Sequence, residues 1–165
     1  RVIAAMKFER LDYLGGQLGA AVTQRPWFRD LAADVRARRG ARPFDAVVPV
    51  PLHAWRRFRR GHDQARGIAE PIAAALGVPC RNLLRRRRAT APQSARDEAE
   101  RRRNVRDAFV CRGPQRGKTV LLVDDVYTTG STLIAAARPL VRAGATVEAL
   151  VVARTPRWDE VPGVE

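Results

Sequence analysis

Cysteine is scarce in this sequence. Cys80 and Cys111 are its only two cysteines, and their spacing is not that of a Cys-x-x-Cys pair. Structural zinc sites and disulfide frameworks both need several cysteines at short, regular spacings. The sequence therefore predicts no structural zinc and no disulfide framework, and the cytoplasm is the expected compartment.

Long apolar runs are also missing. No stretch approaches the roughly 20 apolar residues that a membrane-spanning helix needs, and no secretory signal peptide is visible. The 165 residues are enough for one domain with a buried core. We therefore expect a single domain without a membrane span.

Lysine and acidic residues are few. Lys7 and Lys118 are the only lysines among 31 basic residues, and 17 acidic residues leave a net charge of +14. A surface this rich in arginine attracts polyanions. Charge alone does not distinguish phosphorylated small molecules from nucleic acid, so both stay candidate partners.

The stretch from Val120 to Thr132 reads VLLVDDVYTTGST and combines an apolar run with two acids and several hydroxyl side chains. The run 120–123 is too short for a helix and rich in branched side chains, which predicts a strand buried on both faces. Asp124 and Asp125 sit at its carboxyl end. Because ligands of open α/β sheets bind outside the carboxyl ends of the strands, we expect a ligand site here.

A hydroxyl-rich turn follows the acids and leads into a helical segment. Its residues are Val126, Tyr127, Thr128, Thr129, Gly130, Ser131 and Thr132. A helix amino terminus offers backbone N–H groups and a positive dipole end to an anion. Hydroxyls donate to phosphate oxygens, and a glycine lets the backbone approach closely. The turn therefore predicts a phosphate site.

The two aspartates need a different partner, because carboxylates accept hydrogen bonds and repel phosphate. They suit the hydroxyls of a sugar or a hydrated divalent metal. A sugar diol beside a phosphate indicates a ribose 5-phosphate. The alternative is an ordinary helix cap, with Ser131 or Thr132 at the N-cap position. An ordinary cap does not need a buried strand that ends in paired acids, so we favour the ligand site.

The rest of the chain alternates helical and extended patterns. Apolar spacing predicts helices at 11–22, 26–39, 61–76 and 131–143, and strands at 45–52, 78–84 and 147–153, the last a buried strand. In the second helix, a buried stripe is expected of Trp27, Phe28, Leu31 and Val35. Pro71 predicts a kink or a helix that begins near it, and Pro139 predicts a kink.

This alternation predicts an α/β fold with a parallel sheet and right-handed crossovers. Residues 1–165 form one domain, in which helices of 1–43 make a small hood over the carboxyl edge of the sheet. The core spans 44–154, and the tail 155–165 has no periodicity.

The segment Gly113–Thr119 invites a nucleotide-binding P-loop interpretation, which fails. Three residues separate its glycines where four are needed, and a strand follows where a helix is required. We interpret the segment as a turn before the central strand.

At residues 120–132 the sequence resembles the type I phosphoribosyltransferases. Their signature for 5-phosphoribosyl 1-pyrophosphate (PRPP) has four apolar residues, two acids, two variable residues and a Thr-Gly turn, and each position is filled here. The resemblance implies a three-layer, Rossmann-like parallel sheet and PRPP bound by residues 124–132. It implies Mg²⁺ at Asp124 and Asp125, directly or through water. A loop after the first strand would bind pyrophosphate, and it comprises Val50, Pro51, Leu52 and His53.

An ordered set of motifs narrows the resemblance to the competence protein F (ComF) family. These motifs are VPVPL at 48–52, Arg60-Gly61-x-x-Gln64, Thr90-x-x-Gln93, Arg101-x-x-Asn104 and Ala108-Phe109. The likeness covers about 44–154. The chain departs from the family at His62-Asp63, where Phe-Asn is usual, and it lacks the amino-terminal zinc module common in members.

The most charged segment, 85–106, lies where the superfamily has a flexible loop that closes over the active site. Arg101 and Asn104 belong to the family motif and are the candidate catalytic residues on this loop. Most of the other arginines are as well explained by a solvated basic loop.

Three functions stay open. The resemblance implies phosphoribosyl transfer from PRPP to an unknown acceptor, with a role in competence or DNA uptake. Some relatives that act on purines carry an acid where this chain has Thr128, so the chain lacks that base and sensing of PRPP without turnover is a second option. The third is a nucleic-acid module that binds single-stranded DNA or the competence machinery on the same scaffold. The sequence indicates neither the acceptor nor the oligomeric state.

Overall fold

The computed structural model describes residues 14–39, 44–51, 63–86 and 108–155. In chain order its elements are α2 (Leu14–Thr23), α3 (Pro26–Arg39), β1 (Ala46–Pro49), α5 (Gln64–Leu76), β2 (Leu84–Arg86), β3 (Phe109–Cys111), β4 (Thr119–Tyr127), α7 (Ser131–Arg142) and β5 (Thr146–Arg154). The predicted alternation of helices and strands is confirmed.

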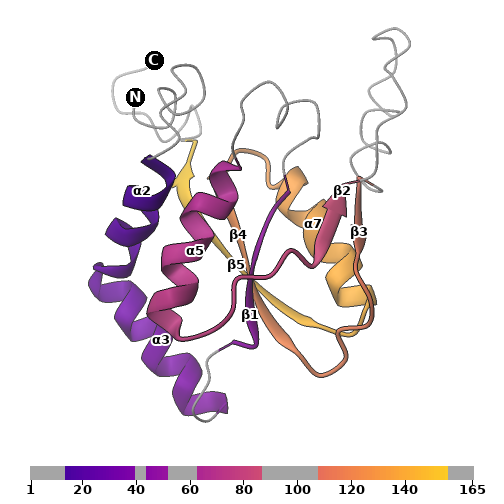
Figure 1. Ribbon diagram of the computed structural model, residues 1–165, viewed down its shortest axis with the longest axis horizontal. Helices are drawn as coiled ribbons and strands as arrows, with labels where there is room; N and C mark the ends of the chain where they lie inside the picture. The colour runs from indigo at the N-terminus through magenta and orange to yellow at the C-terminus, as the bar shows by residue number, and fades with distance from the viewer. Residues whose placement is uncertain (1–13, 40–43, 52–62, 87–107, 156–165) are drawn as a thin grey trace, which may run out of the picture.

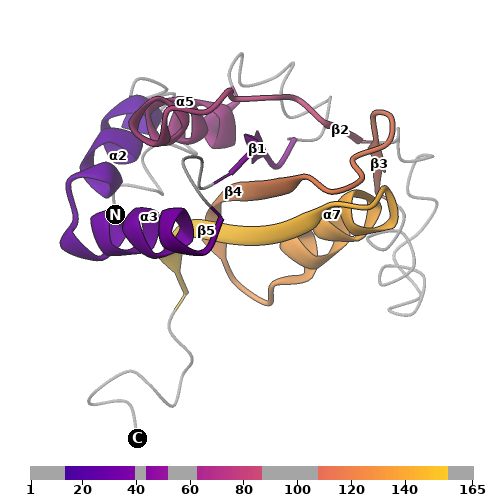
Figure 2. The ribbon, with the colours of Figure 1, turned by 90° about the horizontal axis from the view of Figure 1, so that it is seen from below.

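A parallel sheet in the order β1-β4-β5 forms the middle layer of the molecule. Helix α5 covers one face and α7 the other, so the described residues make three layers (Figures 1 and 2). The predicted α/β class with a parallel sheet is therefore confirmed. No helix of the described residues is long and apolar enough to cross a membrane.

The core is divided by the alternation of side chains along β4. Leu121 and Val123 point to the α5 face and join one apolar cluster, whereas Val120 and Leu122 join another that contains α7. All four side chains are at most 1% exposed. The short apolar run singled out in the sequence is thus the centre of the fold.

Strand β5 corrects one expectation. It forms where a strand was predicted, but only Leu150 of its nine residues is buried. The reason is its position, because among the described strands β5 pairs with β4 alone and lies at the edge of the sheet.

Helix α5 runs without interruption through Pro71 and begins seven residues before it. Asp63 caps its first turn, and Gly77 ends it in the left-handed conformation with φ of 66°. An interior proline costs about 3 kcal/mol, but Ile68 and Ile72 are fully buried on the same helix. Each buried aliphatic side chain contributes about 1.5–3 kcal/mol, which offsets that cost. The alternative of a helix that begins near Pro71 is wrong.

The two amino-terminal helices lie along the flank of the sheet. Helix α2 packs mainly on α5 and also reaches α3 and β5. The prediction placed this hood over the carboxyl edge, but the described part of α2 lies beside α5, and α3 contacts α2 (Figures 1 and 2). Trp27 is also not part of the buried stripe, since it is 49% exposed. Phe28 takes the inward position, and successive helical residues point about 100° apart.

The predicted strand at 78–84 does not form. Cys80 makes a single isolated bridge to Val47, and residues 84–86 pair antiparallel with β3 in a separate two-stranded sheet. Pro79 accepts a hydrogen bond from the Val47 N–H but has no N–H to donate. Pairing with β1 therefore stays limited to one bridge.

Candidate functional site

The carboxyl end of β4 carries the candidate site. The strand was predicted to end at Val123, but it continues through Asp124 and Asp125 to Tyr127, paired with β5. The two acids therefore lie within a hydrogen-bonded strand and not in a loop after it. Their backbone positions are fixed by the same ladder that holds the core.

The two carboxylates leave the strand on opposite sides. Continuing the alternation of residues 120–123 puts Asp124 on the α7 face and Asp125 on the α5 face. In agreement, Asp124 lines a small cavity with Thr132 and Leu133 of α7. Its Oδ1 accepts a hydrogen bond of 2.9 Å from the backbone N–H of Asp125. Both residues are half-buried, so a ligand that touches both must lie across the end of the strand.

The turn after β4 presents the start of α7 to solvent. Thr128, Thr129 and Ser131 are exposed, and Gly130 is the N-cap residue with φ of 74°. As a glycine, it has no side chain with which to cap the helix. The alternative of an ordinary cap by Ser131 or Thr132 is therefore wrong.

Hydroxyls within the turn organise its backbone. Thr129 Oγ1 and Ser131 Oγ are 2.8 Å apart, and the Ser131 N–H donates to Thr129 Oγ1 over 3.4 Å. The first backbone bond of α7 runs from Ile134 N–H to Gly130 O. The turn is thus ordered by its own polar groups, while its hydroxyls remain on the surface.

Gly130 is required by its neighbour as well as by its backbone angle. A Cβ on this residue would lie 2.8 Å from Tyr127 Cε2 and 2.9 Å from the Tyr127 hydroxyl oxygen. The tyrosine ring therefore packs directly on the glycine. No other residue fits this position without displacing either the ring or the turn.

The predicted pyrophosphate loop starts beside the site. Val50 follows β1, and its N–H donates to Val123 O of β4 over 2.9 Å. Pro51 comes next, while Leu52 and His53 lie outside the described residues, as do Arg60, Gly61, Arg101 and Asn104. Gln64 of the family motif is the first residue of α5 and is 4% exposed. The structure thus brings Val50 and Pro51 next to the end of β4.

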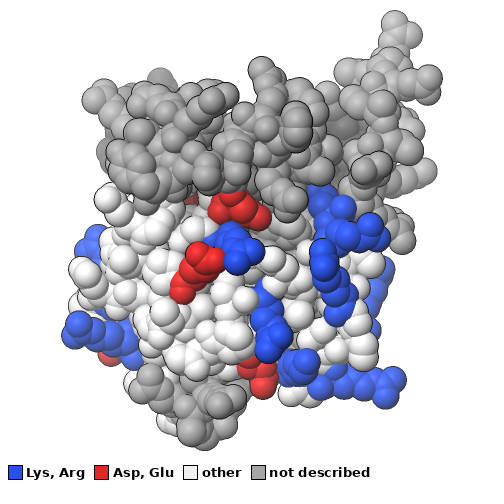
Figure 3. Space-filling model, viewed as in Figure 1, with Lys and Arg blue, Asp and Glu red and all other residues white. Residues whose placement is uncertain are grey.

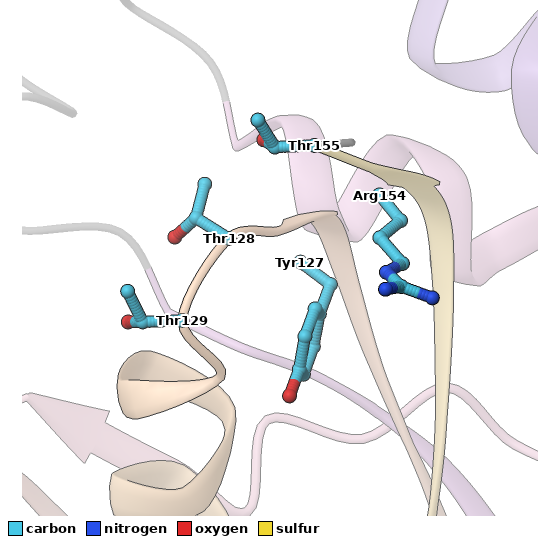
Figure 4. Close-up of a pocket in the computed structure, with 5 residues that line it drawn as sticks. All are labelled: Tyr127, Thr128, Thr129, Arg154 and Thr155. Atoms are coloured by element: carbon cyan, nitrogen blue, oxygen red, sulfur yellow. The ribbon is translucent and has the colours of Figure 1, made fainter. Parts of the chain in front are cut away.

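A larger cavity lies between the ends of β4 and β5, and the sequence reasoning missed part of its lining. Its volume is about 690 Å³, and it is lined by Tyr127, Thr128, Thr129, Arg154 and Thr155. Figure 4 shows the two threonines of the turn on one side, the end of β5 on the other, and Tyr127 between them. Arg154 and Thr155 were not predicted, although the rule about carboxyl ends of strands applies to β5 as it does to β4.

The part of the chain that the structure describes offers neither a metal cage nor a reactive thiol. Among these residues, no group of three or more His, Cys, Asp or Glu side chains is placed to hold a metal ion. Both cysteines are free thiols. Burial raises the pKa of Cys80 and of Cys111 above the ordinary thiol value, which makes both poor nucleophiles at neutral pH.

A family model described as the phosphoribosyl transferase domain matches residues 63–162. This chain belongs to that family. The resemblance found in the sequence is confirmed by relatives that carry the name competence protein F. That of Haemophilus influenzae is 38% identical over 93 residues, which cover 54% of this chain and 41% of the relative. ComFC of Streptococcus pneumoniae is 35% identical over 98 residues, covering 59% and 42%.

A longer match is to the DNA utilization protein YhgH of Salmonella typhimurium, 33% identical over 156 residues, which cover 93% of this chain and 66% of the relative. The chain spans about half to two-thirds of the length of these YhgH relatives. Among solved structures, a purine phosphoribosyltransferase of Pyrococcus horikoshii aligns with 80% of this chain and 76% of its own, at 19% identity and a TM-score of 0.46.

Proposed function

We propose that this chain binds PRPP at the carboxyl end of β4, as a phosphoribosyltransferase-like domain. One observation carries the proposal: the amino terminus of α7, where the N-cap residue Gly130 has no side chain, follows after a short turn on β4, which carries two aspartates near its carboxyl end. The helix start favours an anion. The acids exclude a bare anion and favour the hydroxyls of a sugar. A ribose that carries a 5-phosphate satisfies both parts of the site.

In this arrangement the 5-phosphate lies over the turn. Thr128, Thr129 and Ser131 are exposed there, and their hydroxyls can donate to its oxygens. The ribose diol lies across the end of β4, where Asp124 and Asp125 leave on opposite sides. Val50, whose N–H donates to Val123 O of β4, and Pro51 after it would lie on the side of the pyrophosphate.

Mg²⁺ fits this donor set without being caged by it. The two half-buried carboxylates are hard oxygen ligands, and Mg²⁺ is usually bound by one or two carboxylates together with substrate phosphates and water. When bound, the ion would neutralise charge on the pyrophosphate. The chain itself would contribute Asp124 and Asp125, which orient the ribose hydroxyls or the metal's water ligands.

Calorimetric titration with PRPP, with and without Mg²⁺, tests the proposal. We expect binding that depends on Mg²⁺, and Asp125→Asn should weaken it at least tenfold, because the amide loses the charge that strengthens hydrogen bonds to the ligand. Asp30→Asn is the matched control, since Asp30 is exposed on α3 and lines neither of the two cavities described above. Equal PRPP affinity of wild type and Asp125→Asn would contradict the assignment.

The proposal leaves two uses of bound PRPP. Phosphoribosyl transfer to an acceptor is one; sensing of PRPP without turnover is the other, and Thr128 in place of an acid is compatible with it. The names of the relatives, competence protein and DNA utilization protein, extend the proposal to a role in DNA uptake or use.

A nucleic-acid function is the second candidate, favoured by the distribution of charge. Exposed cations gather around the β2–β3 sheet and the turn before β4 (Figure 3). They are Arg81, Arg85, Arg112, Arg116 and Lys118. If this surface binds single-stranded DNA, affinity should fall steeply with salt, with a slope set by the number of phosphates neutralised. Binding that is absent or insensitive to salt would exclude this function.

A further inference from the structure

We propose that Tyr127 is a positioning residue for the phosphate of the ligand. Its ring holds the N-cap glycine of α7 in the left-handed conformation, and so keeps the first N–H groups of the helix directed toward the proposed phosphate. The inference rests on the proposed function. It adds to that function a role for a residue that occupies one of the two variable positions of the PRPP signature.

The backbone of Tyr127 is fixed at the end of the sheet. Tyr127 is the last residue of β4, and its partner in the register is the last residue of β5. Its carbonyl oxygen also accepts a hydrogen bond of 2.9 Å from the Thr155 N–H, directly after that pair. The turn toward α7 begins at the next residue. Tyr127 is therefore the fixed point from which the turn leaves the sheet.

The side chain of Tyr127 folds back onto this turn. Its Cε2, hydroxyl oxygen and Cζ lie 2.8, 2.9 and 3.0 Å from the position that a Cβ of Gly130 would occupy. Apart from the immediate chain neighbours of Gly130, no described residue has an atom nearer to that position. The outer edge of the ring therefore covers Gly130 on the side where other residues carry a side chain.

A glycine at this place needs such a contact to keep one conformation. Glycine adopts positive and negative φ about equally readily, and Gly130 has φ of 74°. Rotation about this angle would reorient the first N–H groups of α7 relative to the hydroxyls of Thr128 and Thr129. Because the ring restricts that rotation, one phosphate can contact both sets of donors. Fixing a free backbone residue on binding instead corresponds to a loss of affinity of roughly five- to thirtyfold.

The ring also occupies the inner side of the turn. The cavity that remains there, beside Asp124 and the first turn of α7, has a volume of about 10 Å³. That is about the space that one water molecule needs, and a phosphate needs more. The side chains of Thr128 and Thr129 leave the turn on the side away from the ring (Figure 4). The phosphate is therefore expected on that outer side.

Substitutions of Tyr127 test the inference by calorimetry with PRPP and Mg²⁺. Tyr127→Ala, which removes the ring, should weaken PRPP binding at least about fivefold. Tyr127→Phe should restore the affinity to within about threefold of the wild type, because packing of the ring edge on Gly130 needs no hydroxyl. Trp27→Ala is the matched control. It removes another partly exposed aromatic side chain, on α3 and outside both cavities, and should leave PRPP affinity unchanged.

Backbone relaxation of the ¹⁵N-labelled protein measures the positioning itself. Without ligand, the amides of Gly130 and Ser131 should have order parameters of about 0.85, typical of rigid backbone, in the wild type and in Tyr127→Phe. In Tyr127→Ala they should fall below about 0.6, and saturating PRPP should raise them again. The amide of Val123 should stay rigid in all three proteins, which shows that each variant is folded.

A double-mutant cycle tests whether Tyr127 acts through Gly130. In the wild type, Gly130→Ala introduces a Cβ that meets the ring. In the Tyr127→Ala background that space is open, and the strain of the left-handed angle remains. The loss of PRPP affinity caused by Gly130→Ala should therefore be at least about threefold smaller in this background than in the wild type.

The outcomes separate the two proposals. Failure of the wild type to bind PRPP would overturn the proposed function and the role of Tyr127 with it. PRPP binding of equal affinity in the wild type and Tyr127→Ala would overturn the role of Tyr127 alone. Equal weakening in Tyr127→Phe and Tyr127→Ala would also overturn it, because the hydroxyl would then contact the ligand directly. Additive effects in the cycle, or a rigid Gly130 in Tyr127→Ala, would show that Tyr127 does not act through Gly130.

Discussion

At the scale of single residues, Gly130 is the position where backbone and side-chain demands meet. Its φ of 74° disfavours any residue with a Cβ, and the Tyr127 ring occupies the space that a Cβ would need. The same residue begins the helix whose first N–H groups are proposed to face the phosphate. The absence of a Cβ at Gly130 therefore matters for the backbone angle, for the packing of the Tyr127 ring and for the proposed ligand binding.

Gly130→Ala is expected to lower PRPP affinity at least tenfold and stability by about 1–2 kcal/mol, the usual penalty for a left-handed non-glycine residue. Gly77→Ala is the matched control. Gly77 has φ of 66°, but a Cβ there would meet no atom within 4 Å, and it ends α5 far along the chain from the turn. It should lose similar stability and keep its PRPP affinity. Calorimetry and thermal unfolding measure both quantities; equal PRPP affinity in the two variants would contradict the role of Gly130.

At the scale of elements, α2 packs against α5 through glycine residues. A Cβ on Gly19 would lie 2.5 Å from the backbone oxygen of Ile68 and 3.1 Å from Pro71 Cγ. Gly15 and Gly67 also face each other, at ordinary contact distance. Small residues thus let the two backbones approach, and α2 is held against the helix that covers the sheet.

Gly19→Ala should therefore destabilise the fold by about 1–3 kcal/mol, in the range of overpacked core substitutions. Gly16→Ala, three residues earlier on the same helix, should stabilise it by about 0.5–1 kcal/mol, because a Cβ there meets nothing within 4 Å and alanine favours the helix. Chemical denaturation of the two variants gives the comparison. The packing of α2 on α5 would be contradicted if Gly19→Ala were as stable as Gly16→Ala.

The elements also show what the sequence could and could not predict. The run 120–123 and the helix after it were found because short-range apolar patterns specify them. The extension of β4 to Tyr127 was missed, since polar residues such as Asp124 break the apolar pattern while the backbone still pairs with β5. The prediction of a strand at 78–84 was wrong. The apolar pattern of this segment fits a strand, but Pro79 limits its pairing with β1 to one bridge.

In the candidate site, too, some features follow from the local sequence and others depend on tertiary pairing. The turn with Gly130 could be predicted from consecutive residues. Arg154 could not, because its place beside Tyr127 depends on the register between two strands that are separated by a whole helix. Contacts of this kind depend on tertiary pairing and not on local spacing.

At the scale of the whole molecule, stability is expected to be graded across the sheet. Strand β4 is paired on both sides and contains four side chains at most 1% exposed, whereas β5 lies at the edge of the described sheet. Core strands open only with global unfolding, while less protected segments open locally. The molecule should therefore be most rigid along its central strand.

Native-state hydrogen exchange measures this gradient. Amides of Val120–Val123 should exchange with the free energy of global unfolding, and those of Val147–Ala153 should exchange through smaller openings. PRPP should slow exchange in the turn after β4, since a ligand that binds only the closed form stabilises it. Equal protection of β4 and β5 would contradict the expected gradient.

The continuous nine residues of β4 also constrain how this protein can evolve. Because each successive side chain faces the opposite side of the sheet, one inserted or deleted residue upstream of Asp124 would exchange the sides of both aspartates and of the packed residues together. Such a change would remove core and ligand groups at once. We therefore expect β4 to tolerate substitutions beyond Val123 more readily than insertions or deletions, and new ligand preferences to come from the segments that surround it.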